Sequence, residues 1–342
     1  MSDVRSLRLR VSDVAAETPD ACSIVFDADL DYRPGQFLTL RIPSEECGSV
    51  ARCYSLSSSP YTGDAPQVTV KRDGYASNWL CDHVRPGSEL EVLPPSGVFT
   101  PASLDADLAL FAGGSGITPV LSIVRSVLAK GSGSLTLVYA NRDERSVIFA
   151  RVLRELAEEH PDRLTVVHWL ESLQGLPDPG RLRTLAEPLR EREAFLCGPR
   201  PFMNAVTTAL RALDVPKSRI HSEKFVSLGG NPFDDVESAG PEPGTGQEDV
   251  QTPATVTVDL DGTVSTFPWP RRRTLLDLLL ERGLDAPYSC REGRCSACAC
   301  RITSGEVTMI DNDVLDAEDI AEGIVLACQS LPLTDEVSIS YE

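Results

Sequence analysis

The stretch Cys290-Arg-Glu-Gly-Arg-Cys-Ser-Ala-Cys298 places three cysteines on one short loop with the spacing C-x4-C-x2-C. A fourth cysteine, Cys328, follows after 29 intervening residues. Three sulfurs can surround one group only where the backbone turns tightly, and Gly293 permits such a turn because it has no side chain. The fourth sulfur comes from a distant segment, so the group that these thiols hold would also close a long loop. The C-terminal part of the chain is therefore expected to fold around a metal site.

Three kinds of site use cysteines in such groups. The spacing matches that of the four thiolate ligands of plant-type [2Fe–2S] clusters. Structural zinc usually uses two C-x2–4-C pairs, whereas Cys328 stands alone in its segment. Disulfides are disfavoured because the first twenty residues carry charges throughout and have no apolar export signal. We therefore predict a cytoplasmic protein with a [2Fe–2S] cluster on Cys290, Cys295, Cys298 and Cys328.

The remaining cysteines show no metal-binding spacing. Cys300 follows Cys298 by two residues, on the same face of a predicted strand. A spare ligand and a packed thiol are both open there, and the packed thiol is favoured. We interpret four further cysteines as packing residues: Cys22, Cys47, Cys53 and Cys81.

The charge of the chain is unevenly placed. The 342 residues, enough for two or three domains, carry a formal net charge of −19. Residues 254–342 hold 16 acidic and 7 basic side chains, and residues 229–253 hold 6 acidic and no basic ones. Such a balance would repel phosphates and argues against nucleic-acid binding. No apolar run is long enough to predict a membrane span. An acidic C-terminal third suits either docking on a basic protein surface or plain solubility.

Residues 1–103 are expected to form a β-barrel, because short apolar runs alternate with Pro, Gly and Asp turns. Two stretches in this region carry binding potential. Arg52-Cys-Tyr-Ser-Leu-Ser57 sets a cation, an aromatic ring and hydroxyl groups along a strand. Lys71-Arg-Asp-Gly-Tyr-Ala-Ser-Asn-Trp79 has a glycine turn that opens a helix, and free N–H groups at such a turn suit a diphosphate.

Residues 104–228 alternate strands and helices, which predicts an α/β doubly wound parallel sheet. The junction Gly113-Gly-Ser-Gly-Ile-Thr-Pro119 joins a strand to a helix and offers N–H groups to a dinucleotide. It lacks the G-x-G-x-x-G pattern of the usual fingerprint. Cys197-Gly-Pro lies at the end of a later strand, at the edge where ligands bind such sheets.

The rest of the chain divides into a linker and a small domain. Residues 229–253 are rich in Gly, Pro, Asp and Glu, which predicts a flexible acidic linker. Residues 254–342 show strands, an Asp261-Gly turn and a helix that Thr274 caps. This pattern predicts an α+β, β-grasp-like domain for the cluster.

The three signatures Arg52-Cys-Tyr-Ser-Leu56, Gly113–Pro119 and Cys197-Gly-Pro, in this order, resemble the ferredoxin–NADP reductase superfamily. With the plant-type ferredoxin domain appended, nearly the whole chain resembles the reductases that supply bacterial oxygenases. The strings 74–83, 139–143, 168–175 and 289–293 most resemble the reductase components of 3-ketosteroid 9α-hydroxylases. The resemblance implies a multi-domain fold and FAD rather than FMN.

The resemblance also implies roles for single residues. Glu223 and Phe225 are similar to the family's closing Glu-x-Phe and would lie by the flavin, with Ser55 near its reactive nitrogen. No acid–base catalytic residue is expected, because the cofactors carry the chemistry. The implied flavin positions are Arg52, Tyr54, Ser55, Leu56, Lys71, Gly74, Ala76 and Ser77. The implied nicotinamide positions are Gly114, Gly116, Thr118, Cys197 and Gly198.

The function that follows is electron transfer from NADH through FAD and the cluster to a separate, Rieske-type oxygenase that acts on a steroid. Reduction of another oxygenase, such as a phenylacetyl-CoA type, is an alternative, as are a free-standing diaphorase or flavin reductase and a redox sensor. NADPH stays open as the donor, because Arg142 suits a 2′-phosphate whereas Asp143 would repel one. The substrate is set by the partner, which the sequence does not identify.

Overall fold

The computed structural model describes residues 6–233 and 252–341, which group into two compact units. The larger unit comprises Leu7–Ser44 and Arg52–Phe225. The smaller unit comprises Glu45–Ala51 and the described residues from Val226 onward. Each unit has its own hydrophobic core, so each is described by itself.

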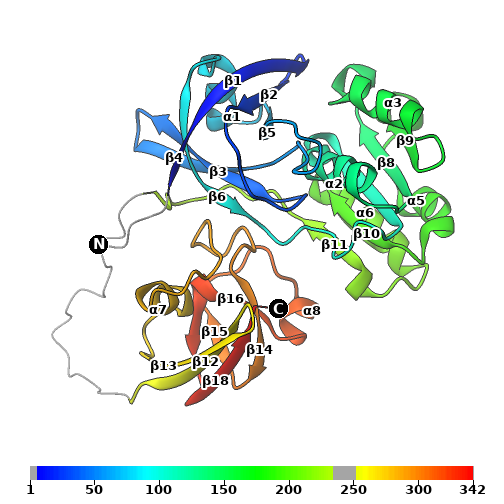
Figure 1. Cartoon of the computed structure of the whole chain (residues 1–342). Helices are drawn as coiled ribbons and strands as arrows, with labels where there is room; N and C mark the ends of the chain where they lie inside the picture. Colours follow the sequence, from blue (N-terminus) through cyan, green and yellow to red (C-terminus); the bar gives the residue numbers. More distant parts are fainter. Residues whose placement is uncertain (1–5, 234–251, 342) are drawn as a thin grey trace. The chain divides into compact units, whose positions relative to one another are not determined.

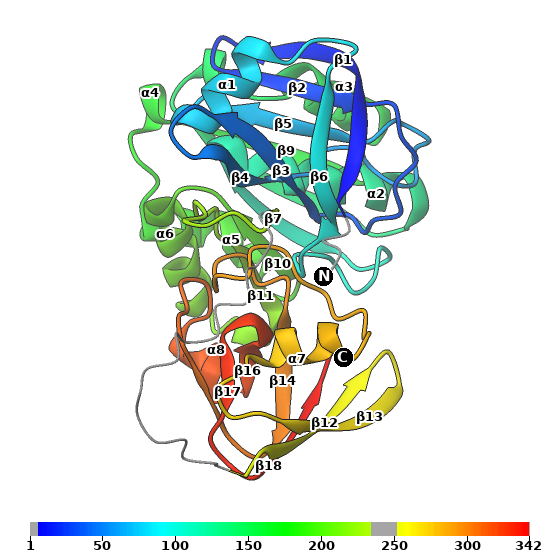
Figure 2. The ribbon, with the colours of Figure 1, turned by 90° about the vertical axis from the view of Figure 1, so that its left-hand side faces the viewer.

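The first sheet of the larger unit closes on itself. Its order is β4-β3-β6-β1-β2-β5, with antiparallel neighbours throughout the pairs β1–β2, β1–β6, β2–β5 and β3–β6. A bridge between Leu56 and Val68 joins the two edges of this sheet, as expected for a barrel. Helix α1 lies beside it (Figure 2). The bounds are β1 Leu7–Thr18, β2 Ala21–Phe26, β3 Phe37–Ser44, β4 Gly48–Ser55, β5 Gln67–Lys71, α1 Tyr75–His83 and β6 Glu89–Ser96.

The second sheet of the larger unit is parallel, with the order β11-β10-β7-β8-β9. Alternate residues of β7 pack on opposite faces: Leu110 joins a core with α2 and α3, whereas Phe111 joins one with α5 and α6. The predicted doubly wound sheet is therefore confirmed (Figure 1). The bounds are β7 Leu108–Gly113, α2 Ile117–Lys130, β8 Leu135–Asn141, α3 Ala150–Glu159, β9 Leu164–Leu170, α4 Glu171–Gln174, α5 Pro179–Ala186, β10 Glu193–Cys197, α6 Arg200–Arg211 and β11 Ile220–Glu223.

The smaller unit packs one helix against a mixed sheet of order β13-β12-β18-β14-β16. Thr274 caps this helix, α7, by accepting a hydrogen bond from the N–H of Asp277, as the sequence predicted. Leu275, Leu279 and Trp269 fill the core together with the cluster-loop cysteines. The bounds are β12 Ala254–Leu260, β13 Thr263–Trp269, α7 Leu275–Glu281, β14 Ala299–Ser304, β15 Val307–Met309, α8 Ala317–Ala321, β16 Ile324–Leu326, β17 Ser330–Pro332 and β18 Glu336–Ser340.

The predicted linker, 229–253, falls mostly on residues 234–251, which lie outside the described part of the chain. Its first residues are held in place: the N–H groups of Gly229 and Gly230 bond to the carboxylate of Glu292, and Phe233 is buried. Among the described residues, no helix combines the length and the apolar character that a membrane crossing requires.

Candidate functional site

The structure brings the four predicted ligand cysteines together. Cys290, Cys295 and Cys298 lie between α7 and β14, and Cys328 lies in the turn after β16. Hydrogen bonds join the Cys290 thiol to those of Cys295 and Cys328, and another joins Cys298 to Cys328. Cys290, Cys298 and Cys328 are buried, whereas Cys295 is half-buried. Residues 38 positions apart thus meet at one point in the fold.

Further donors point at these sulfurs. The backbone N–H groups of Glu292 and Arg294 lie 3.4 and 3.3 Å from Sγ of Cys290. The N–H of Cys290 lies 3.4 Å from Sγ of Cys295. The neighbouring thiols of Cys295 and Cys328, followed by these N–H groups, lower the pKa of Cys290. The loop therefore favours the thiolate, which is the form that binds metals.

The loop turns through left-handed backbone, as the sequence predicted at Gly293. Its φ is +74°, and a Cβ atom there would lie 2.8 Å from the carbonyl oxygen of Asp311. Arg291 and Ser296 also have positive φ, 60° and 56°. Non-glycine residues adopt this conformation at a cost and are held there by their surroundings. Gln329, which the sequence analysis missed, supplies one such restraint, since its side-chain amide donates to the carbonyl of Arg291 at 2.8 Å.

The arrangement fits a two-iron cluster better than a single metal ion. Among the described residues, no group of three or more His, Cys, Asp or Glu side chains converges on one ion position. A tetrahedral zinc site would need four ligands around one point. In a [2Fe–2S] cluster each iron takes two protein thiolates, so pairs of sulfurs suffice. The paired contacts of Cys290 with Cys295 and of Cys298 with Cys328 match that requirement.

Charged side chains next to the loop are paired. Arg291 forms an ion pair with Asp277, and Arg294 lies 3.1 Å from Asp313. Arg294 also donates to the carbonyl of Ser227 at 3.1 Å. These contacts join segments far apart in the sequence, so residue spacing gave no signal for them.

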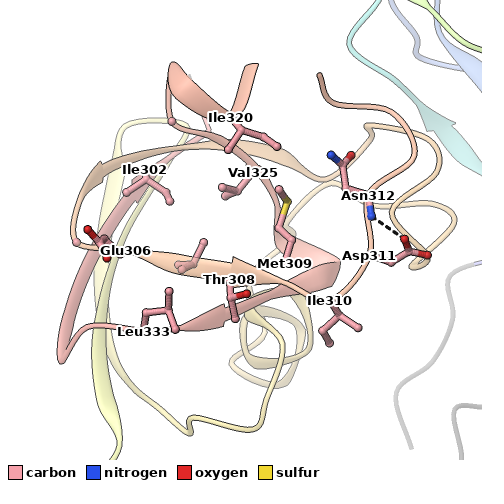
Figure 3. Close-up of a pocket in the computed structure, with 13 residues that line it drawn as sticks. Ile302, Glu306, Thr308, Met309, Ile310, Asp311, Asn312, Ile320, Val325 and Leu333 are labelled. Carbon is pink, nitrogen blue, oxygen red and sulfur yellow. Dashed lines mark hydrogen bonds between the residues drawn. The ribbon is translucent and has the colours of Figure 1, made fainter. Parts of the chain in front are cut away.

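An apolar groove of about 670 Å³ adjoins the loop (Figure 3). Ile310 and Leu333, on its rim, are 64% and 56% exposed, an uncommon state for large apolar side chains. The next residue, Asp311, is the one whose carbonyl packs against Gly293. The groove and the cluster loop are thus neighbours on one surface of the smaller unit.

The predicted flavin residues gather where the barrel closes. Ser55 and Leu56 are buried at the end of β4, and Arg52 and Tyr54 are half-buried beside them. Burial of the Tyr54 side chain raises the pKa of its phenol, which therefore stays neutral. Lys71 ends β5, which the Leu56–Val68 bridge brings to the same place.

The first turn of α1 contains three more predicted flavin residues. Gly74 is the N-cap, with φ of 89° and no side-chain capping bond. Ala76 and Ser77 follow and are buried. The Ser77 hydroxyl accepts a hydrogen bond from the N–H of Asp73 at 2.7 Å and donates one to the carbonyl of Gly74. Helix N–H groups without a side-chain cap suit an anion such as a diphosphate.

The predicted nicotinamide residues meet at the carboxyl ends of β7 and β10, which are neighbours in the sheet. Gly116 is required there, because a Cβ atom would lie 2.2 Å from the carbonyl oxygen of Cys197. Gly198, with φ of 159°, packs against Gly113 in the same way. The Thr118 hydroxyl donates to the carbonyl of Ser115 at 3.1 Å and so tightens the loop.

Gly114 connects the two predicted nucleotide sites. Its carbonyl accepts a hydrogen bond from the Tyr139 hydroxyl at 3.0 Å, a contact that the sequence analysis missed. A Cβ atom on Gly114 would lie 3.8 Å from Nζ of Lys71, a predicted flavin residue. The two sets of residues therefore face one common region of the larger unit.

Glu223 lies at this junction. Its carboxyl group accepts a hydrogen bond from Ser55, yet burial dominates and raises the pKa of Glu223 to about 8. Its Oε2 atom is buried and has no hydrogen-bond partner among the described residues. Cys197, on the neighbouring strand, is buried, and burial followed by the Glu223 charge raises its pKa. An unsatisfied buried oxygen fits a site that a ligand completes. Phe225, two residues on, is 53% exposed.

Comparisons with known proteins agree with this geometry. Residues 258–333, which span the four ligand cysteines, match the family described as 2Fe-2S iron-sulfur cluster binding domain. Residues 110–208 match the oxidoreductase NAD-binding domain. The solved structure of phthalate dioxygenase reductase, described as modular for electron transfer from pyridine nucleotides to [2Fe-2S], is similar, with a TM-score of 0.57 and 25% identity over 98% of each chain.

Two relatives extend along nearly the full length. One of the proteins that make up the 1,2-phenylacetyl-CoA epoxidase of Escherichia coli is 34% identical, with 98% of this chain and 97% of that protein covered. The ferredoxin reductase component of the 3-ketosteroid-9-alpha-monooxygenase of Rhodococcus rhodochrous is 56% identical, again over 98% and 97% of the two chains. The chain therefore belongs to the family of 3-ketosteroid-9-alpha-monooxygenase ferredoxin reductase components.

Proposed function

We propose that this protein takes electrons from NADH and passes them through FAD and a [2Fe–2S] cluster to a Rieske-type oxygenase that hydroxylates a 3-ketosteroid. The observation that carries the proposal is the pairing of the four cysteine sulfurs in a chain that also holds a glycine-lined parallel-sheet edge. The cofactors, when bound, supply hydride acceptance and one-electron transfer. The chain supplies binding, orientation and electrostatics.

The larger unit would hold the two nucleotides against each other. The uncapped first turn of α1 would bind the FAD diphosphate, with Arg52 and Lys71 as its cationic partners. Gly116 and Gly198 leave room for the backbone to approach NADH closely. Because hydride transfer needs the two reacting rings in contact, this close approach serves orientation.

Glu223 would hold a proton at this junction. A pKa of about 8 means that the carboxyl group is mostly protonated at neutral pH. A neutral carboxyl group can donate a hydrogen bond from its buried oxygen, whereas a carboxylate would add a buried negative charge beside Cys197. We assign Glu223 and Ser55 to tuning of the flavin environment.

NADH is favoured over NADPH by two contacts. The Arg142 guanidinium lies 3.3 Å from the carboxylate of Asp20, which offsets its charge. The Asp143 side chain accepts from the N–H of Ser146 in a capping box, which fixes a carboxylate at the position where a 2′-phosphate would approach. The ratio of kcat/KM values for the two nucleotides tests this assignment, and a preference for NADPH would contradict it.

The partner test combines the holoprotein, NADH, a purified Rieske-type oxygenase and a 3-ketosteroid, with hydroxylated product as the readout. The wild-type protein should support hydroxylation. A Cys295→Ser variant should lose hydroxylation yet keep NADH-driven flavin reduction, because its defect is confined to the smaller unit. A Cys47→Ser variant, which changes an exposed cysteine outside the cluster loop, is the matched control.

Two results would overturn the proposal. Loss of flavin reduction in a folded Cys295→Ser variant would refute the division of labour between the units. Fast flavin reduction of small acceptors by the wild-type protein, without any coupled hydroxylation, would instead indicate a free-standing diaphorase.

A further inference from the structure

Two cysteines of the larger unit, 59 positions apart, lie side by side. Sγ of Cys22, on β2, is 3.1 Å from Sγ of Cys81, on α1. A disulfide bond measures about 2.05 Å, so the sulfurs need to approach by only about 1 Å. Neither cysteine belongs to the cluster loop, and the sequence analysis interpreted both as packing residues. The fold thus forms a thiol pair that residue spacing did not indicate.

The pair has a fixed seat. Cys22 is opposite Val70 in the antiparallel pairing of β2 and β5. The Cys81 sulfur lies 3.9 Å from the carbonyl oxygen of the same Val70. Helix α1 therefore rests its Cys81 directly over the β2–β5 ladder. A disulfide here requires no large backbone movement, which is the usual obstacle to bond formation.

The two thiols have different roles. The hydrogen bond from Cys22, assisted by the nearby Arg72 guanidinium, lowers the pKa of Cys81. The same hydrogen bond and burial raise the pKa of Cys22. Cys81 is half-buried, whereas Cys22 is only 9% exposed. Cys81 is thus the accessible sulfur with thiolate character, and Cys22 is the neighbouring thiol within reach.

We propose that Cys22 and Cys81 form a reversible disulfide when the protein meets hydrogen peroxide. The Cys81 thiolate attacks one peroxide oxygen, breaks the O–O bond and becomes a sulfenic acid, while the released hydroxide takes up a proton as water. The Cys22 sulfur then attacks the Cys81 sulfur, and the hydroxyl group leaves as a second water. Two thiols and one peroxide thus give one disulfide and two waters.

The bond would fasten α1 to β2. Helix α1 begins at the turn that contains Gly74, Ala76 and Ser77, the residues proposed for the FAD diphosphate. A covalent tie at Cys81 restricts the departure of this helix from the barrel. Under the proposed function, the oxidised protein should release FAD more slowly than the reduced protein.

The test begins with the holoprotein, treated with hydrogen peroxide, alkylated under denaturing conditions and digested with trypsin. Mass spectrometry should find the Cys22 and Cys81 peptides linked, about 2 Da lighter than their sum, and separated again by dithiothreitol. The two thiols should disappear about tenfold faster than the exposed Cys47 thiol, which bonds to the carbonyl of Ser49.

Two single variants separate the roles. Cys22→Ser should accumulate a sulfenic acid on Cys81 that dimedone traps, because the resolving sulfur is gone. Cys81→Ser should leave Cys22 as a thiol. Circular dichroism checks that both variants fold. The absence of a linked peptide in the wild-type protein, or a sulfenic acid on Cys22 in Cys81→Ser, would overturn the proposal.

FAD release separates this inference from the proposed function. Dilution of the oxidised wild-type protein should release FAD several-fold more slowly than dilution of Cys22→Ser. Equal rates in spite of a linked peptide would contradict the role of α1 in holding FAD, whereas the disulfide itself would stand. A Cys295→Ser variant should form the same link, because the cluster takes no part in it.

Discussion

The Ser55 hydroxyl donates a hydrogen bond to the carboxyl group of Glu223 and so joins the end of β4 to the end of β11. These two strands belong to different sheets of the larger unit. Cys197 lies on the strand next to Glu223, and burial raises the pKa values of both side chains. A buried carboxyl group held between two sheets makes the stability of this unit depend on pH.

Glu223→Gln should flatten that dependence. The folded-state pKa of about 8 exceeds the ordinary value of 4.5, so the folded protein keeps a proton that the unfolded chain releases in between. The free energy of unfolding should therefore fall as pH rises from about 4.5 to about 8. Glutamine stays neutral, so the variant should fall less steeply. Denaturant titrations of the holoprotein at several pH values measure this slope. Glu158→Gln, exposed on α3, should leave it unchanged.

Gly116→Ala should damage both folding and nucleotide binding. The new Cβ atom would lie 2.2 Å from the carbonyl oxygen of Cys197 and 2.6 Å from the nitrogen of Gly198, both backbone atoms of β10 and its following turn. Overpacking of this kind costs about 3 kcal/mol. The dissociation constant for NADH should rise at least about tenfold, as 1.4 kcal/mol corresponds to a factor of ten. Ser115→Ala, which adds no atom to the same loop, should change either quantity little. Near-normal NADH binding by a folded Gly116→Ala protein would contradict this account.

The sequence predicted those features in which residue type follows from local geometry. Gly293 was expected in a tight turn, Thr274 at a helix start, and the loop after Gly113 at a strand–helix junction, and the structure confirms each. Spacing also identified the four cysteines that meet, because three of them share one loop.

Contacts between distant segments were beyond that reasoning. Gln329 supports the cluster loop through the carbonyl of Arg291, and Glu292 holds the N–H groups of Gly229 and Gly230. Glutamine and glutamate are common on surfaces, so neither residue type gave a signal. The approach of Cys81 to Cys22 depends on the packing of α1 over β2 and β5, which periodicity alone does not specify.

Gly293→Ala tests the turn of the cluster loop, with Gly262→Ala as a matched control. Both glycines have φ near +75°, but a Cβ atom on Gly293 would lie 2.8 Å from the carbonyl oxygen of Asp311, whereas one on Gly262 would meet open space. Gly262→Ala should cost about 1 kcal/mol from the backbone conformation alone. Gly293→Ala should cost more and lower the iron and sulfide content per protein several-fold. Equal cluster contents in the two variants would show that the close approach to Asp311 does not matter.

Cys300→Ala should keep the cluster, whereas Cys298→Ala should lose it. The Cys298 sulfur bonds to that of Cys328, and its carbonyl accepts from the N–H of Ala327, so this residue belongs to the ligand group. Cys300, opposite Val325 in the pairing of β14 with β16, is 4% exposed within the hydrophobic core of the smaller unit. Truncation of a small buried side chain there should cost about 1 kcal/mol of unfolding free energy through the cavity that it leaves. Visible absorption with iron analysis measures the cluster, and denaturant titration measures the stability. Loss of iron in a folded Cys300→Ala protein would place this thiol among the ligands and overturn its interpretation as a packing residue.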